Sequence, residues 1–343
     1  MKMLKTSFLL SGLVLGASAS MANAASPCGA GNTIRFAGID WESGSFITEV
    51  MKTILSKGYG CEVESIPGTS VVLEHATVTN DIQIFAEQWV GRSDVWNEAV
   101  SKGTVINVGK PFVGASEGWF VPAYVVHGDE ARGIKPVAPD LKSVSQLADP
   151  KMKALFADPE EPAKGRFLNC PSGWSCEAIS SAKLEAYHLD KDYTNFRPGT
   201  GTALDAAIAS TYTQGEPILF YYWSPTAVMG KYKLIQLEEP AYSDACWKEL
   251  SSVTGKREQG CAFPSVAVTY GVNAEFAKAA PEIIAILEKA TIPLSDVNAT
   301  LAYMADNQLD GTAAATHFLK TKADEWGTWV SPEAKAKIEA ALQ

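Results

Sequence analysis

The sequence lacks the features of several common classes of protein. Basic side chains are few, since 29 Lys and Arg stand against 39 Asp and Glu, for a formal net charge of −10. This balance argues against nucleic acid or an anionic lipid surface as a partner, because both require a basic surface. Beyond the first residues no apolar stretch is long enough to span a bilayer, and the sequence contains neither an internal repeat nor a low-complexity segment.

Motifs of catalysis and of cofactor binding are also missing. The sequence contains no Gly-x-Ser-x-Gly and no His-Glu-x-x-His. Gly29-Ala30-Gly31 does not stand between a strand and a helix, so the dinucleotide fingerprint fails. Histidine is scarce, and none of the four has a zinc-site spacing to the cysteines. We therefore expect no catalytic residue, no metal and no cofactor.

The first residues have the pattern of a targeting signal. Lys2 and Lys5 precede the apolar run Phe8–Ala17, and Ala22-Asn23-Ala24 forms an A-x-A cleavage site. We predict a signal peptide over residues 1–24, cleaved after Ala24, and a periplasmic mature protein.

The six cysteines all follow this leader. An even number of cysteines in an exported chain favours disulfides over a metal site. Sequence proximity predicts three pairs, which are Cys28 with Cys61, Cys170 with Cys176, and Cys246 with Cys261.

Strands and helices alternate in the first part of the chain. Apolar patterns predict strands over Thr33–Gly38, Cys61–Ile66 and Asp81–Glu87, with helices Ser45–Lys57 and Thr69–Thr79 between them. This rhythm predicts a parallel sheet with helices on both faces. In such sheets, ligands bind beyond the carboxyl ends of the strands.

The length of 343 residues predicts two domains. Glu117–Val126 and Val266–Val272 are extended runs that we interpret as crossings between them, and Pro217–Trp223 is an apolar strand of the buried type. The predicted fold is α/β, with two α/β lobes joined by two extended crossings. The first lobe would comprise residues 25–116 and 265–343, and the second residues 117–264.

The stretch from Cys170 to Cys176 holds Trp174 in a short loop, directly before the predicted helix Ala178–Tyr187. The backbone N–H groups of Ser175 and Cys176 would lie at the start of this helix, where free donors and the helix dipole favour an anion. An aromatic face beside an anion site suits a small zwitterion with a quaternary ammonium group.

Nine tryptophans are present, and most tryptophans in proteins belong to the core. Four of them follow predicted strands or begin loops on the cleft side, in both lobes, and indole faces attract methylated ammonium groups by about 0.5–2 kcal/mol each. The predicted cage consists of Trp41, Trp89, Trp174 and Trp223.

Charged residues near these positions allow two interpretations. Glu87 and Glu117 either face the cleft and balance a cation or pair with a basic residue at the hinge. Arg92 and Ser93 either meet a carboxylate at a helix start or, for the arginine, are solvated or salt-bridged.

Several segments together resemble the glycine betaine/proline betaine-binding proteins of ABC importers, over essentially the whole mature chain. The Cys-x5-Cys loop with its tryptophan and the Tyr-Trp-x-Pro strand end are the most specific. The segments are Asp40-Trp41, Glu87-Gln88-Trp89, Glu117-Gly118-Trp119-Phe120-Val121-Pro122, Asn169-Cys170-Pro171-Ser172-Gly173-Trp174-Ser175-Cys176-Glu177 and Phe220-Tyr221-Tyr222-Trp223-Ser224-Pro225.

The resemblance implies the two-lobed periplasmic-binding-protein fold of type II, which closes on a quaternary ammonium held in a tryptophan box. Carried over, the box is Trp89, Trp174 and Trp223, and the ligand carboxylate meets the N–H groups of Ser175 and Cys176. The chain departs from the family pattern in two places. It has Arg92-Ser93 where betaine binders can present a histidine, and Asp40-Trp41-Glu42 is similar to the choline binders. An acidic neighbour such as Glu42 favours a cation without a carboxylate.

The expected function is that of a monomeric, non-enzymatic solute-binding protein, which delivers a methylated ammonium osmoprotectant to an ABC permease with its ATPase. Glycine betaine is the first candidate ligand, and choline or trimethylamine N-oxide is the alternative. An exported enzyme acting on a betaine-like compound, or a sensor that docks on a receptor, are the alternatives of another class.

Overall fold

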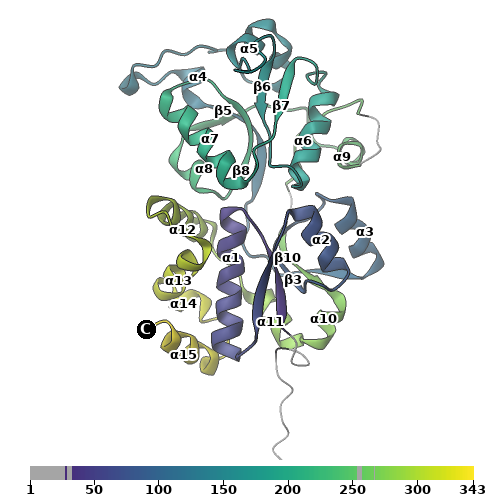
Figure 1. The fold of residues 1–343 in the computed structure, drawn as a ribbon, viewed down its shortest axis with the longest axis vertical. Helices are drawn as coiled ribbons and strands as arrows, with labels where there is room; N and C mark the ends of the chain where they lie inside the picture. Colours follow the sequence, from purple (N-terminus) through teal and green to yellow (C-terminus); the bar gives the residue numbers. More distant parts are fainter. Residues whose placement is uncertain (1–27, 29–32, 253–256, 266) are drawn as a thin grey trace, which may run out of the picture.

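The structure is a computed structural model that describes residue 28 and residues 33–252, 257–265 and 267–343. The chain forms two lobes, one above the other in Figure 1. The predicted signal peptide, residues 1–24, lies outside the described residues. Within the described part of the chain, no helix is both long and apolar enough to cross a membrane.

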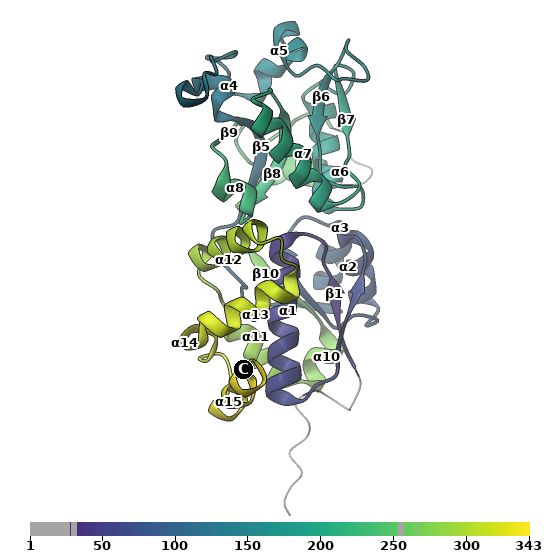
Figure 2. The ribbon, with the colours of Figure 1, turned by 60° about the vertical axis from the view of Figure 1, so that its left-hand side comes forward.

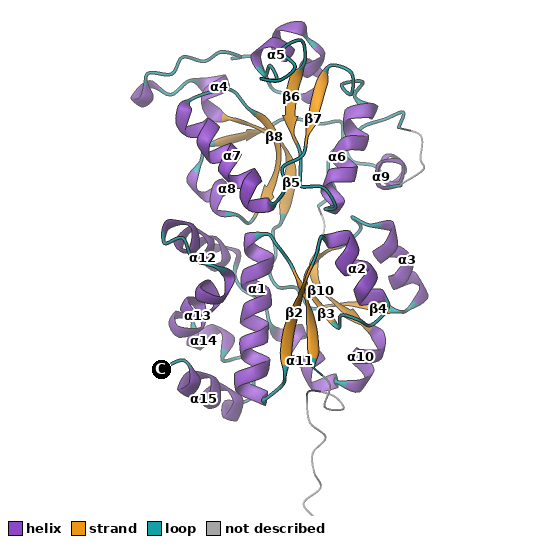
Figure 3. Ribbon diagram, viewed as in Figure 1, coloured by secondary structure: helices purple, strands orange, loops and turns teal. Residues whose placement is uncertain are grey.

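The first lobe is built on a five-stranded sheet with the order β2-β1-β3-β10-β4. Helices lie on both faces of this sheet (Figure 3). Its strands are β1 Ile34–Gly38, β2 Val63–Pro67, β3 Ile84–Trp89, β4 Val105–Val108 and β10 Val268–Asn273, and its helices are α1 Glu42–Thr53, the π-helical turn Ile54–Gly58, α2 Ser70–Val78, α3 Asp94–Lys102, α10 Ala274–Ala279 and α11 Pro281–Lys289.

The second lobe has its own five-stranded sheet, with the order β7-β6-β8-β5-β9. The strands are β5 Ser116–Pro122, β6 Gly165–Leu168, β7 Tyr193–Phe196, β8 Leu219–Ser224 and β9 Leu234–Gln236. The α-helices are α4 Ala123–His127, α5 Pro150–Leu155, α6 Ser175–Ala186, α7 Gly201–Gln214, α8 Ala227–Lys231 and α9 Asp244–Ser251, with 3-10 turns at Glu130–Arg132 and Val144–Ala148.

The C-terminal helices return to the first lobe and cover α1 (Figure 2). The Phe46 ring of α1 meets Phe318 edge-on, with centroids 5.4 Å apart, and both side chains are fully buried. These helices are α12 Leu294–Asp306, α13 Gly311–Thr321, α14 Ala323–Trp326 and α15 Pro332–Ala341. The C-terminal helices are therefore part of the first-lobe core.

The sheets are mixed rather than purely parallel as predicted. β1 pairs in parallel with β2 and β3, as the alternating pattern indicated, but β10 runs antiparallel to both β3 and β4. In the second sheet β5 runs antiparallel to β8. The reversed strands are the two that enter after the chain has changed lobe, so they arrive from the opposite end of the sheet.

The first crossing is shorter than the sequence indicated. The predicted extended run to Val126 is wrong, because β5 ends at Pro122 and Ala123–His127 is helical. Pro122 occupies the N-cap position of this helix with φ of −58°. Its fixed φ and missing N–H end the strand and suit the start of a helix.

Candidate functional site

One pocket lies where the carboxyl ends of strands from both lobes meet. Its lining includes residues of β3, β5 and β8 and of the loop after β6, together with the starts of α1, α2 and α6. The lining residues are Trp41, Ser70, Glu74, Phe85, Glu87, Gln88, Trp89, Arg92, Glu117, Trp174, Ser175, Cys176, Tyr221 and Trp223. The structure thus brings together eight of the ten side chains or backbone positions that the sequence proposed for a ligand.

Trp174 lies between a tryptophan of each lobe. Its ring centroid is 5.2 Å from that of Trp41 and 5.4 Å from that of Trp223, and both contacts are edge-on. The indole N–H of Trp174 donates to Oδ1 of Asp40 in the first lobe at 3.0 Å. Aromatic pairs prefer this edge-to-face geometry, so the second-lobe ring is held by both halves of the molecule.

A buried carboxylate orients the two first-lobe indoles. Oε1 of Glu87 accepts from the indole N–H of Trp41 at 2.8 Å, from that of Trp89 at 3.0 Å and from the hydroxyl of Ser43 at 3.2 Å. Oε2 of Glu87 is buried and has no hydrogen-bond partner among the described residues. Burial raises the pKa of Glu87 to about 7, against the three hydrogen bonds, which lower it. The carboxyl group can therefore change its charge near neutral pH.

Arg92 lines the pocket but is already paired. Its guanidinium forms an ion pair with Glu117, and the hydroxyl of Tyr221 donates to the same carboxylate. The guanidinium stacks over Trp247, with its central carbon 4.8 Å from the ring centroid, and donates to the carbonyl of Pro264 at 3.2 Å. Of the two interpretations of Arg92 and Glu117, the structure shows the ion pair, at the junction of the two lobes.

Two predicted residues, Ser93 and Glu42, are not among the residues that line the pocket. Ser93 is the N-cap of α3 and accepts from the backbone N–H of Trp96. Glu42 accepts from the backbone N–H of Ala227, in the second lobe, at 3.4 Å. Ser93 therefore caps the start of α3, and Glu42 joins the lobes beside the pocket.

Disulfides join all three predicted cysteine pairs, Cys28–Cys61, Cys170–Cys176 and Cys246–Cys261. Disulfides are typical of proteins in oxidising, extracytoplasmic compartments. The second of them closes the loop that carries Trp174.

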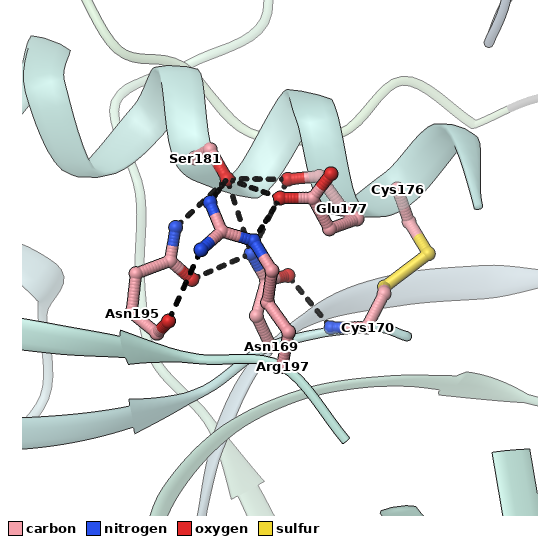
Figure 4. Close-up of polar contacts among 7 residues, drawn as sticks. All are labelled: Asn169, Cys170, Cys176, Glu177, Ser181, Asn195 and Arg197. Atoms are coloured by element: carbon pink, nitrogen blue, oxygen red, sulfur yellow. Dashed lines mark hydrogen bonds and ion pairs between the residues drawn. A yellow bond between two sulfur atoms is a disulfide. The ribbon is translucent and has the colours of Figure 1, made fainter. Parts of the chain in front are cut away.

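A polar network behind this loop holds it in place (Figure 4). The fully buried side chain of Asn169 accepts from the backbone N–H of Cys170 at 2.7 Å and donates to Oδ1 of Asn195 at 2.9 Å. The guanidinium of Arg197 pairs with Glu177, in the first turn of α6. The network fixes both ends of the loop, and through them the direction of the indole.

Replacing Cys170 and Cys176 together by serine is expected to lower the free energy of unfolding by about 2 kcal/mol, since the unfolded chain regains the entropy of a short loop. Ligand affinity should fall as well, because the loop positions Trp174. Urea denaturation and calorimetric titration measure the two effects.

The matched control is the double serine variant of Cys28 and Cys61. This disulfide closes a longer loop and lies outside the pocket lining, so it should cost more stability and leave affinity unchanged. Equal loss of affinity in both variants would contradict a local role of the Cys170–Cys176 loop.

The sequence did not single out five lining residues, which are Ser70, Glu74, Phe85, Gln88 and Tyr221. Gln88 donates to Glu74 at 2.8 Å, and both side chains are buried. Gln88 stands in the strand-end segment that was recognised, so a signal existed for it. Ser70 and Glu74 lie on α2, where a helical pattern gives no information about the opposite lobe.

Two α/β lobes around one buried pocket define the class of two-lobed ligand-binding proteins. Comparison with solved structures supports this fold: an ABC-transporter choline-binding protein in complex with choline superimposes with a TM-score of 0.71 at 18% identity, covering 91% of this chain and 98% of that one. The family model described as the substrate binding domain of ABC-type glycine betaine transport systems matches residues 32–321. The chain belongs to this family, whose members bind substrates rather than convert them.

Relatives of known function are distant. The glycine betaine/proline betaine-binding periplasmic protein of Escherichia coli (strain K12) is 26% identical over 205 residues, which are 56% of this chain and 59% of that protein. The trimethylamine N-oxide-binding protein of Pelagibacter ubique (strain HTCC1062) is 24% identical over 290 residues, which are 84% of this chain and 87% of that protein. The chain spans about half the length of the first three curated relatives, at 59, 50 and 48%.

Proposed function

We propose that this protein captures a small methylated ammonium compound between its lobes and delivers it to an ABC permease. The observation that carries the proposal is the convergence of four indoles, from both lobes, on one pocket with a buried carboxylate. Indole faces attract a methylated cation, and Glu87 lies where it can balance the charge. The proposed ligand-binding groups are Trp41, Trp89, Trp174, Trp223, Glu87, Arg92, Glu117, and the backbone at Ser175 and Cys176.

The charges of the pocket favour a ligand without a carboxylate. Glu74, Glu87 and Glu117 line it together with a single cation, Arg92, and that cation is paired with Glu117. Burial raises the pKa of both Glu74 and Glu87, so a nearby cation would stabilise their ionised forms. We therefore place choline or trimethylamine N-oxide ahead of glycine betaine, the first candidate from the sequence. The names of relatives and solved structures include glycine betaine, choline and trimethylamine N-oxide, so this order rests on the charges of the pocket alone.

The proposed mechanism is closure of the lobes around the ligand. Contacts across the lobes surround the pocket, among them Trp174 to Asp40 and, further out, the ion pair of Lys231 with Asp306. These direct contacts join the lobes but do not surround a cation. A bound ligand would add contacts of its own with the rings of both lobes. Binding thus shifts the open–closed equilibrium, because only the closed form makes all contacts.

Delivery requires export and a partner. We propose cleavage after Ala24, a periplasmic monomer, a permease with its ATPase as partner, and lobes that comprise residues 25–116 with 265–343, and 117–264. The names of the periplasmic relatives support the proposed location.

Calorimetric titration of the refolded protein tests the ligand class. Choline, trimethylamine N-oxide and glycine betaine are compared with ethanolamine and glycine, which lack the methyl groups. We expect choline to bind at least about a hundredfold more tightly than ethanolamine, since several rings contribute about 0.5–2 kcal/mol each. Binding of none of the methylated compounds, or equal affinity for ethanolamine and choline, would refute the cage.

A further inference from the structure

The start of helix α6 receives a hydrogen-bond acceptor from the opposite lobe. Trp174 occupies the N-cap position, and its side chain makes no capping hydrogen bond. Instead, Oγ of Ser70 accepts the backbone N–H of Ser175 at 3.1 Å. The Ser70 hydroxyl in turn donates to the carbonyl of Gly173 at 3.3 Å. Ser70 is therefore a helix cap supplied by the other lobe.

The backbone of both lobes is shaped for this contact. The N–H of Val71 also donates to the carbonyl of Gly173, at 3.3 Å. Gly173 has φ of +87°, and a Cβ at this position would lie 2.8 Å from Oγ1 of Thr69. Only glycine tolerates both the conformation and the close approach. The contact of α2 with the tryptophan loop thus holds Ser70 against the start of α6.

The sequence predicted an anion at the backbone N–H groups of Ser175 and Cys176, and Ser70 occupies the first of these two donors. A free N–H at a helix start binds a carboxylate well, but here a neutral hydroxyl satisfies the donor of Ser175. Ser70 is only 6% exposed and lines the same pocket as the tryptophans. A ligand carboxylate at this N–H would displace the hydroxyl and would share the pocket with Glu74 and Glu87. A broken buried hydrogen bond and nearby like charges both oppose it.

We propose that Ser70 is a specificity-determining residue, which occupies the anion position of α6 and thereby selects methylated cations that have no carboxylate. The inference rests on the proposed function of the pocket. Choline or an amine oxide leaves the hydrogen bond between Ser70 and Ser175 intact, whereas glycine betaine has to break it to reach the same donor.

The test compares the affinities of choline, trimethylamine N-oxide and glycine betaine for the wild type and for Ser70→Ala, Ser70→Gly and Ser70→Thr. The wild type should bind choline or the amine oxide more tightly than glycine betaine. Alanine or glycine frees the N–H of Ser175, so the ratio of affinities should move toward glycine betaine by about tenfold or more. Threonine keeps a hydroxyl and should keep the wild-type ratio. Two variants lack the hydroxyl, so the comparison can still be made if one of them does not fold.

Asp306→Asn is the matched control, because it weakens another contact between the lobes outside the pocket lining. It should change the affinities for all three ligands by the same factor. If Ser70→Ala and Ser70→Gly also change the affinities for all three ligands by the same factor, Ser70 only holds the lobes together and the proposed selectivity is wrong. A wild type that prefers glycine betaine also overturns it, while the proposed function stands. A wild type that binds none of the three overturns both.

Discussion

Choline affinity is expected to fall by about a hundredfold when Glu87 is replaced by glutamine. A carboxylate and a cation about 5 Å apart attract each other by roughly 3 kcal/mol at an effective dielectric constant of about 20, and glutamine removes this attraction. Its amide oxygen can still accept the indole N–H groups of Trp41 and Trp89, which donate to Glu87 in the wild type. The cage should therefore survive, and titration calorimetry isolates the effect of charge.

Trimethylamine N-oxide provides the internal comparison, because it is neutral overall. Its affinity should change less than tenfold in Glu87→Gln, since an amide N–H can donate to the oxide oxygen. Glu98→Gln, which changes an exposed glutamate of α3, should leave both affinities as they are. A similar loss for choline and for the amine oxide would show that Glu87 acts on the architecture of the cage and not through its charge.

The pH dependence of binding follows from the same group. The pKa of Glu87 is raised to about 7 by burial, and a cation stabilises the ionised form, so protons compete with choline. Choline affinity should be highest above this pKa and should decrease as the pH falls through it, by about tenfold from pH 8 to pH 6. The raised pKa of Glu74 acts in the same direction. In Glu87→Gln, most of this dependence should disappear, and an unchanged pH profile would assign it to another group.

Replacing Trp174 by alanine is expected to weaken binding by about a hundredfold or more for every methylated ligand. The change removes one cation–π contact of about 0.5–2 kcal/mol, and with it the edge-on contacts to Trp41 and Trp223. It also removes the hydrogen bond to Asp40 that joins the lobes. Both the cage and the closed form lose stability, so the two losses add.

Phenylalanine at position 174 separates these contributions. It keeps an aromatic face but has no N–H for Asp40, and about tenfold weaker binding is expected. Trp329→Phe, in the first-lobe core beside Phe318, is the control for a tryptophan remote from the pocket and should not change affinity. Unaltered calorimetric binding in Trp174→Ala would remove the cage from the proposal.

Local patterns were sufficient for most of the fold. The alternation of apolar strands and amphipathic helices over Thr33–Glu87 predicted the parallel part of the first sheet, because burial of one face imposes its period on the sequence. The direction of β10 and β5 was not predictable in this way, since a strand has the same apolar pattern whether it runs parallel or antiparallel. Pro122 lies within the run that was predicted to be extended, and its role as a helix start depends on the turn into the second lobe.

The candidate site, like the fold, was predictable from the sequence only in part. The four tryptophans could be selected because each stands at the end of a predicted strand or in the loop that follows one, and parallel strands place their carboxyl ends together. Whether the donors at the start of α6 are free could not be read from the Cys170–Cys176 loop. The acceptor, Ser70, is 105 residues away in sequence and is brought there by contact between the lobes.

The order of apolar and polar residues, the paired cysteines and the strand-end indoles by themselves determined that this chain forms two α/β lobes with an aromatic pocket between them. These features act through contacts that are local or that recur with a regular period, so they leave a pattern in the sequence. Only the tertiary structure decided the partners of the buried charges, the pairing of Arg92 with Glu117 and the cap that Ser70 provides. Such contacts join distant segments whose separation no local pattern encodes, and they depend on how the two lobes meet.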